Sequence, residues 1–149
     1  MGFCREQYFG LNFAWYMVDA SEAIAMFLSG YGSIPEIVFY DEQKYLRLVG
    51  FFDELPTLTD SFFASDGREI AVGPENMIFK SVRAASAGLF SYDNEEYSAN
   101  YSLDAIPKMK IRVSDLPSDI QDLLKPFTIE TVSFGGVKNI DITDHFECD

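Results

Sequence analysis

Two short hydrophobic runs near the start of the chain are separated by polar residues. They cover residues 12–18 (Asn-Phe-Ala-Trp-Tyr-Met-Val) and 23–28 (Ala-Ile-Ala-Met-Phe-Leu), with Asp19 and Glu22 in the gap between them. Short apolar runs bounded by turn-forming residues predict strands, so the pair predicts a β-hairpin. Because the runs contain few polar positions, we expect the rest of the protein to cover this hairpin on both faces.

Hydrophobic residues at helical spacing predict two main helices and one short helix. The first main helix covers 42–55, with Asp41 as its N-cap. The second covers 74–88, because proline suits a first helical turn and glycine suits a helix end. The short helix lies between Pro117 and Pro126. The residues at helical spacing are Tyr45, Leu48, Val49 and Phe52 in the first helix, and Ile78, Val82, Ala85 and Leu89 in the second.

The rest of the chain predicts further strands and one long loop. The expected strands follow one another as hairpins and do not alternate regularly with helices. The sequence therefore predicts an α+β fold with a mainly antiparallel sheet built from hairpins. We expect one domain over 1–149, with a mobile acidic C-terminal tail from about residue 139. The further strands are expected at 89–92, 97–106, 109–113 and 129–134, and the long loop at 57–73 with one strand near 70–72.

Charge is the compositional feature that excludes classes of binding partner. The 149 residues include 24 Asp and Glu but 11 Lys and Arg, which gives a formal net charge of −13. The acid is spread along the chain, with −5 before residue 57 and −8 after it. Binding to nucleic acid or to an anionic membrane surface depends on cations, so neither is expected of this chain. The 48% of hydrophobic residues supplies a core and excludes general disorder.

The N-terminus and the two cysteines bear on the cellular compartment. The chain starts without the basic segment and continuous apolar run of a signal peptide, so the expected localisation is cytoplasmic. Cys4 and Cys148 lie near opposite ends of the chain. A disulfide between them and two separate thiols both remain open.

The sequence contains few residues suited to catalysis. His145 is the single histidine, and no nucleophile elbow, phosphate-binding loop or zinc motif is present. The acids at 141–147 are interpreted as solvated tail residues. We therefore expect no catalytic residue, no metal site and no cofactor, and a protein that is not an enzyme. Paired carboxylates such as Glu95 and Glu96 need no histidine, so a hydrolase site built on carboxylates stays open.

The aromatic residues fall into two groups. Nine are expected in the core: Trp15, Tyr16, Phe27, Phe51, Phe52, Phe62, Phe63, Phe79 and Phe90. Several tyrosines instead lie beside glycines or acids in predicted loops and strand ends, a composition typical of protein interfaces. A solvated turn is the alternative interpretation. The predicted partner-binding residues are Tyr31, Tyr92, Asp93, Glu95, Glu96 and Tyr97.

Five short patterns occur in order along most of the chain. They are Trp15-x-x-x-Asp19, Ile24-Ala-x-Phe27-x-Ser-Gly30-x-Gly-x-x-Pro35, Gly88-Leu-Phe-x-Tyr-Asp93, Ile106-Pro107 and Asp115-Leu-Pro117. Together they resemble a pattern of small bacterial proteins associated with immunity to secreted or contact-delivered toxins. The turn at 20–23 lacks the glycine expected at that place. The resemblance implies a cytosolic, acidic, non-enzymatic protein that covers a toxin's active surface, and it implies no catalytic residues.

Three functions therefore stay open. The first is an immunity-type inhibitor that binds a cationic toxin domain through complementary charge. The second is a small hydrolase or ligand-binding domain that uses paired carboxylates near the Gly-rich loop at 30–35. The third is an accessory protein of an unrelated assembly. A convex acidic face would favour the inhibitor, whereas a deep apolar cavity with two convergent carboxylates would favour the hydrolase or ligand-binding domain. The oligomeric state is open.

Overall fold

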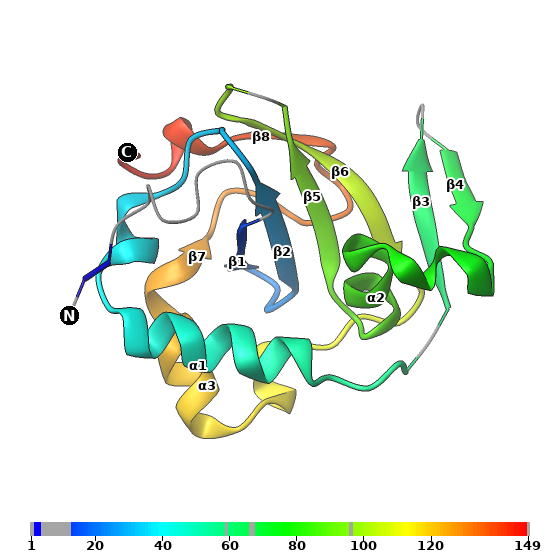
Figure 1. The fold of residues 1–149 in the computed structure, drawn as a ribbon, viewed down its shortest axis with the longest axis horizontal. Helices are drawn as coiled ribbons and strands as arrows, with labels where there is room; N and C mark the ends of the chain where they lie inside the picture. Colours follow the sequence, from blue (N-terminus) through cyan, green and yellow to red (C-terminus); the bar gives the residue numbers. More distant parts are fainter. Residues whose placement is uncertain (1, 4–12, 59, 66–67, 96, 149) are drawn as a thin grey trace.

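A computed structural model describes residues 2–3, 13–58, 60–65, 68–95 and 97–148. This part of the chain forms an α+β fold, as predicted, with eight strands in one sheet and three α-helices (Figure 1). The strands are β1 (Phe13–Asp19), β2 (Ile24–Ser29), β3 (Ser61–Ser65), β4 (Arg68–Ala71), β5 (Phe90–Asn94), β6 (Asn100–Pro107), β7 (Thr128–Ile129) and β8 (Asn139–Asp141); the helices are α1 (Glu42–Asp53), α2 (Lys80–Ser86) and α3 (Ser118–Leu124).

The strand order is β4-β3-β6-β5-β2-β1-β7, and β8 pairs with β6. The sheet of the described residues is mainly antiparallel, as predicted, with five antiparallel strand pairs. Hairpins do not build all of it, because β2 pairs with β5 in parallel and β1 pairs with β7 in parallel. The chain leaves β2, forms α1, β3, β4 and α2, and returns beside β2 in the same direction. A parallel pair needs such a long connection, whereas a hairpin does not.

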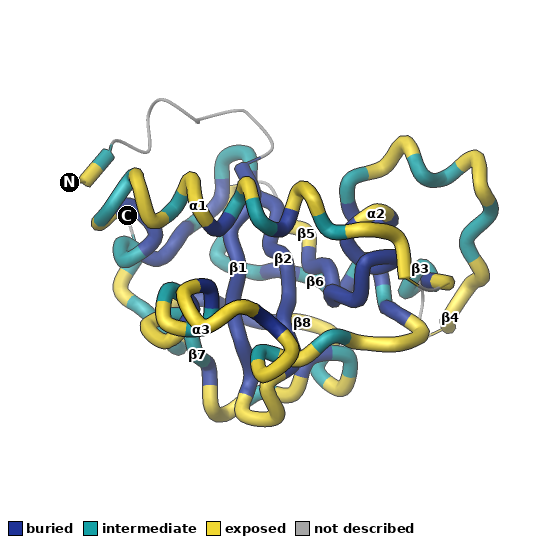
Figure 2. Tube along the Cα trace, turned by 90° about the horizontal axis from the view of Figure 1, so that it is seen from below, coloured by how far each residue is buried: buried dark blue, intermediate teal, exposed yellow. Residues whose placement is uncertain are grey.

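The predicted β1–β2 hairpin is confirmed and lies inside the molecule (Figure 2). Every residue of both strands is buried. Alternate side chains point to opposite faces, so Trp15 and Phe27 enter one apolar cluster while Tyr16 and Met26 enter another. The expectation that both faces of the hairpin are covered is therefore confirmed.

The two faces are covered by different parts of the chain. The three helices pack on the face that carries Tyr16 and Met26, through Leu48, Phe52, Ala84, Ile120 and Leu124. The other face is covered by the segment after β2 and by the C-terminal segment, through Ile34, Val38, Phe39, Phe134, Ile140 and Ile142. α1 begins as predicted, because the Asp41 carboxylate accepts a hydrogen bond from the Lys44 N–H at 3.1 Å.

Glu22 takes the place of a glycine in the β1–β2 turn. Its φ of 68° lies in the left-handed region, which residues other than glycine seldom adopt. The Glu22 carbonyl accepts a hydrogen bond from Val113 N–H at 3.0 Å, and its carboxylate accepts one from Ser114 N–H at 3.1 Å. The segment before α3 therefore holds this residue in place.

Asp19 closes the same turn from inside the protein. One carboxylate oxygen accepts hydrogen bonds from the N–H and the hydroxyl of Ser21 and from the N–H of Ala23. The other accepts a hydrogen bond from the N–H of Phe134, 115 residues further along the chain, at 2.9 Å. The buried carboxylate thus joins the hairpin turn to the C-terminal segment through main-chain hydrogen bonds.

Several predicted elements differ in the structure. The long loop contains β3, which pairs with β6 and β4; a strand forms there because β6 offers an open edge. The second main helix is interrupted, since a 3-10 turn (Pro74–Ile78) precedes α2 and Phe79 between them is extended. Phe79 is 51% exposed, so its expected place in the core is wrong.

The expected strand at 109–113 is also wrong, because this segment makes one isolated bridge, between Ala23 and Arg112. The expected strand at 129–134 is reduced to the two residues of β7, since the chain then turns inward toward Asp19.

The C-terminal segment is packed on the domain, where we expected a mobile tail. β8 pairs with β6, and Ile140 and Ile142 are buried in the core. Further along, Glu147 O accepts a hydrogen bond from Glu36 N–H at 2.8 Å. Charged residues alternate here with buried apolar ones, which explains why the segment has the composition of a tail. Among the described residues, no helix combines the length and the hydropathy needed to cross a membrane.

We predict that Asp19→Ala lowers the free energy of unfolding by roughly 2–4 kcal/mol, because buried N–H groups lose their acceptor. Asp19→Asn keeps one acceptor oxygen and should cost less. Urea denaturation measures both. Asp141→Ala is the control, since Asp141 accepts from Thr143 N–H at the surface. An equal loss in Asp19→Ala and Asp141→Ala would show that the buried carboxylate does not hold the turn.

Candidate functional site

The loop after β2 and the turn between β5 and β6 meet at one end of the sheet. The Asn94 side chain donates hydrogen bonds to Ser98 O and Asn100 O, which shapes the turn. Ser33 N–H also donates to Ser98 O, at 3.0 Å. Gly32 lies so close to Asn94 that a Cβ on Gly32 would clash with the amide. The glycine therefore permits the two loops to dock.

Two of the predicted partner-binding tyrosines come together at this junction. The rings of Tyr31 and Tyr97 are stacked, with centroids 5.1 Å apart and an interplanar angle of 24°. Tyr97 is 73% exposed, and its φ of 59° is in the left-handed region. A bulky residue in this conformation costs about 1–2 kcal/mol, so the backbone at Tyr97 is strained.

Two predicted acids border the tyrosines. Glu95 and Asp93 are both exposed, and Glu95 N–H donates to Asn100 O across the turn. Asp141 on β8 lies opposite Asn100 and is exposed as well. Glu96 lies outside the described residues. We call Tyr31, Asp93, Glu95 and Tyr97 the tyrosine–carboxylate patch.

Tyr92 does not belong to this patch, and its prediction as a partner-binding residue is wrong. Its exposed fraction is 0%, because β5 points it into the core beside Phe27 and Phe134. The hydroxyl donates to Val137 O at 2.6 Å and accepts from Gly135 N–H. Burial raises the pKa of Tyr92 to about 12, and the Asp19 carboxylate adds to this rise. Tyr92 is a structural residue that binds the C-terminal loop.

Asp93 has a neighbour of like charge that the sequence did not indicate. Partial burial, and then the Asp104 carboxylate on β6, raise the pKa of Asp93, while a hydrogen bond from Asn94 N–H opposes the rise. A register shift between Ser91 and Tyr92 sets which residues face each other across this hairpin. Hydrophobic alternation does not reveal such a shift, so the proximity of these two carboxylates was not predictable from the sequence.

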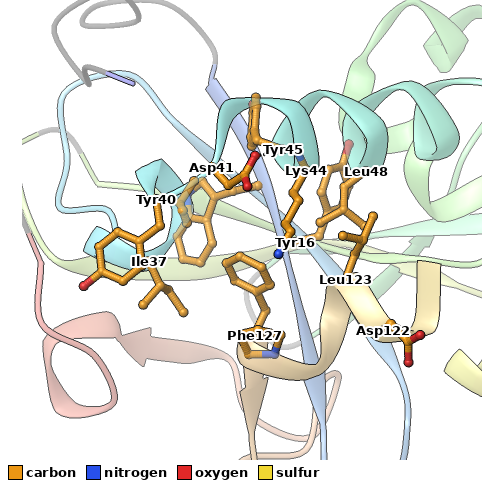
Figure 3. A pocket seen from close by; sticks show the side chains of 13 residues that line it. Tyr16, Ile37, Tyr40, Asp41, Lys44, Tyr45, Leu48, Asp122, Leu123 and Phe127 are labelled. Carbon is orange, nitrogen blue, oxygen red and sulfur yellow. Dashed lines mark hydrogen bonds between the residues drawn. The ribbon is translucent and has the colours of Figure 1, made fainter. Parts of the chain in front are cut away.

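A separate cavity of about 320 Å³ lies beside β1 (Figure 3). It is enclosed by α1, by the 3-10 turn after β2 (Glu36–Phe39) and by the one after α3 (Lys125–Phe127). Its walls are largely apolar, with contributions from Trp15, Tyr45 and Phe127. The alternative hydrolase or ligand-binding hypothesis placed a pocket near residues 30–35, whereas the lining after β2 comes from Ile37 onward.

Two carboxylates line the cavity, and both have partners. Asp41 caps α1, and the hydrogen bond from Lys44 N–H lowers the pKa of its carboxyl, so it is a poor proton donor at neutral pH. Asp122 pairs with Lys125 at 3.0 Å. These contacts do not favour a hydrolase built on this pair. Sequence patterns missed the cavity because its aromatic residues are indistinguishable from core residues.

Comparisons with protein-family models, with curated proteins and with solved structures find no match to this chain. Within the described residues, no group of three or more His, Cys, Asp and Glu side chains is arranged to hold a metal ion. A function for this protein is therefore inferred from the geometry of the tyrosine–carboxylate patch and of the cavity.

We predict that Asp104→Asn stabilises the protein at pH 7 by roughly 0.2–1 kcal/mol, because it removes a like-charge neighbour from a strand pair. A raised pKa of Asp93 means that the folded state binds more protons than the unfolded state between the two pKa values. Stability therefore falls as pH rises through that window. The gain from Asp104→Asn should accordingly be present at neutral pH and disappear below the ordinary carboxyl pKa of about 4.

Denaturant titrations at several pH values measure this effect. Glu69→Gln on β4 is the control, because it removes an exposed carboxylate that faces Ala64 across the strand pair. If both variants gain equally at every pH, the effect reflects total charge and not the contact of Asp104 with Asp93.

Proposed function

We propose that this protein is an acidic, non-enzymatic binding protein, an immunity-type inhibitor that covers the active surface of a basic bacterial toxin. The observation that carries the proposal is the exposed, strained Tyr97 stacked on Tyr31. Glycine or asparagine would suit this backbone conformation better. Strain of this kind is concentrated at functional positions, which supports a binding role for the ring.

The chemistry of the patch suits a protein partner. Tyrosine offers a large, rigid, amphipathic surface that loses little conformational entropy on binding. The stack with Tyr31 further restricts Tyr97 before any partner arrives. The carboxylates of Asp93 and Glu95 beside the rings suit lysine and arginine side chains of a basic surface.

Charge over the whole surface supports the same class of partner. In the described part of the chain four ion pairs join basic to acidic side chains, and these pairs are largely exposed. With a formal net charge of −13, most of the acid is left without a basic neighbour. Such a protein attracts a cationic partner at long range and increases its association rate. A partner's cation near Asp93 would also relieve its repulsion with Asp104.

We predict that the protein rescues growth of cells that express the product of the neighbouring gene, and that the two proteins co-purify. Because charge brings them together, association should weaken as salt concentration rises. Glu95→Lys should reduce the association rate more than Glu69→Lys, which makes the same charge change on β4, away from the patch. A harmless neighbouring product, or no complex at low salt, would contradict the proposal.

We also predict that Tyr97→Gly weakens the complex by about tenfold or more, as expected of an anchoring tyrosine. The folded protein should be unchanged or more stable, because glycine adopts the left-handed conformation without strain. Calorimetry of the complex and thermal unfolding of the free protein measure the two effects separately. Tyr97→Asn is a second variant that tolerates this conformation and lacks the ring. Full affinity in both variants would remove Tyr97 from the interface.

A further inference from the structure

Trp15, one of the residues that line the cavity beside β1, carries a buried polar group. Trp15 lines the cavity and is 1% exposed, and its Nε1–H has no hydrogen-bond partner among the described residues. A buried donor without an acceptor is uncommon in folded proteins and calls for an explanation. Because the Nε1 atom is itself buried, Trp15 belongs to the cavity wall but offers no donor within reach of a ligand.

The edge of β1 adds main-chain groups. Asp19 N–H donates to Ala23 O, so the main-chain groups of Asp19 point toward β2. Because this direction alternates along a strand, the N–H and C=O groups of Ala14, Tyr16 and Val18 point away from β2. On that side Val18 pairs with β7, and Ala14 O accepts from Tyr45 OH at 2.6 Å. Tyr16 lies between them, lines the cavity, and is paired with no described strand on this edge.

Lys44 adds a positive charge at the mouth. Its side chain is exposed and runs from α1 toward Phe127 (Figure 3). Within the described residues its ammonium group forms no ion pair. Asp41 lies close to Lys44, because the hydrogen bond from Lys44 N–H and, more weakly, the Lys44 charge lower the pKa of the Asp41 carboxyl. Asp122 pairs with Lys125. Lys44 therefore places a positive charge at the mouth of a cavity with largely apolar walls.

We propose that this cavity binds a small molecule with an apolar, ring-sized body and one carboxylate. The aromatic and aliphatic walls take the body, and Lys44 binds the carboxylate at the mouth. A volume of about 320 Å³ is at the lower end for ligand pockets, which limits the ligand to a small molecule. This site is independent of the toxin interface proposed above.

The chain has one tryptophan, so its fluorescence reports on this cavity directly. The probes are 4-phenylbutyrate, 4-phenylbutanol and 4-phenylbutylamine, which share a body and differ in charge. We expect a saturable change in Trp15 emission, with the carboxylate binding about tenfold more tightly than the alcohol, as suits a charged hydrogen bond. The amine should bind most weakly. A rise in melting temperature with the carboxylate should accompany the change.

Three variants make the test specific. Lys44→Gln should remove the preference for the carboxylate over the alcohol, whereas Lys110→Gln, an exposed lysine outside the cavity, should keep it. Leu123→Phe should weaken all three probes by filling the cavity. Equal binding of carboxylate and alcohol would overturn the ligand class. No saturable Trp15 response to any probe, or full binding in a folded Leu123→Phe variant, would overturn the site.

Discussion

The β1–β2 hairpin is buried on both faces, and the positions of the other elements follow from the need to cover it. Neither strand has a face that tolerates water, so the sheet cannot rest on one layer of helices. The three helices cover one face, and the segment after β2 together with the C-terminal segment covers the other. This second layer contains little regular structure, and its stability depends on apolar burial and on hydrogen bonds to the hairpin.

Asp19 and Tyr92 supply those hydrogen bonds from within the core. The carboxylate binds Phe134 N–H, and the tyrosine hydroxyl binds Gly135 N–H and Val137 O. Buried main-chain groups need partners, so this irregular loop can lie inside the protein only where such side chains meet it. The same bonds explain why the chain leaves the sheet after β7. They also explain why Tyr92 is unavailable to a partner although its neighbours in sequence are exposed.

Two surfaces of different character result from this arrangement. The tyrosine–carboxylate patch is formed by loops that dock at one end of the sheet, and its exposed rings and acids suit a large basic partner. The cavity is enclosed by α1 and two 3-10 turns beside the edge of β1, and its apolar walls suit a small molecule. The first surface combines charge with backbone strain at Tyr97, whereas the second combines apolar walls with one lysine at the mouth.

The sequence by itself determined the hairpin, the capped start of α1, the end of α2 near Gly88 and the α+β class, because these depend on local periodicity and on turn chemistry. It also indicated that Tyr97 and Glu95 are exposed in a turn. The parallel pairings, the burial of Tyr92, the electrostatic influence of Asp104 on Asp93 and the cavity at Trp15 depend on the tertiary structure. These features join residues far apart in the chain, or depend on strand register, and neither leaves a periodic signal in the sequence.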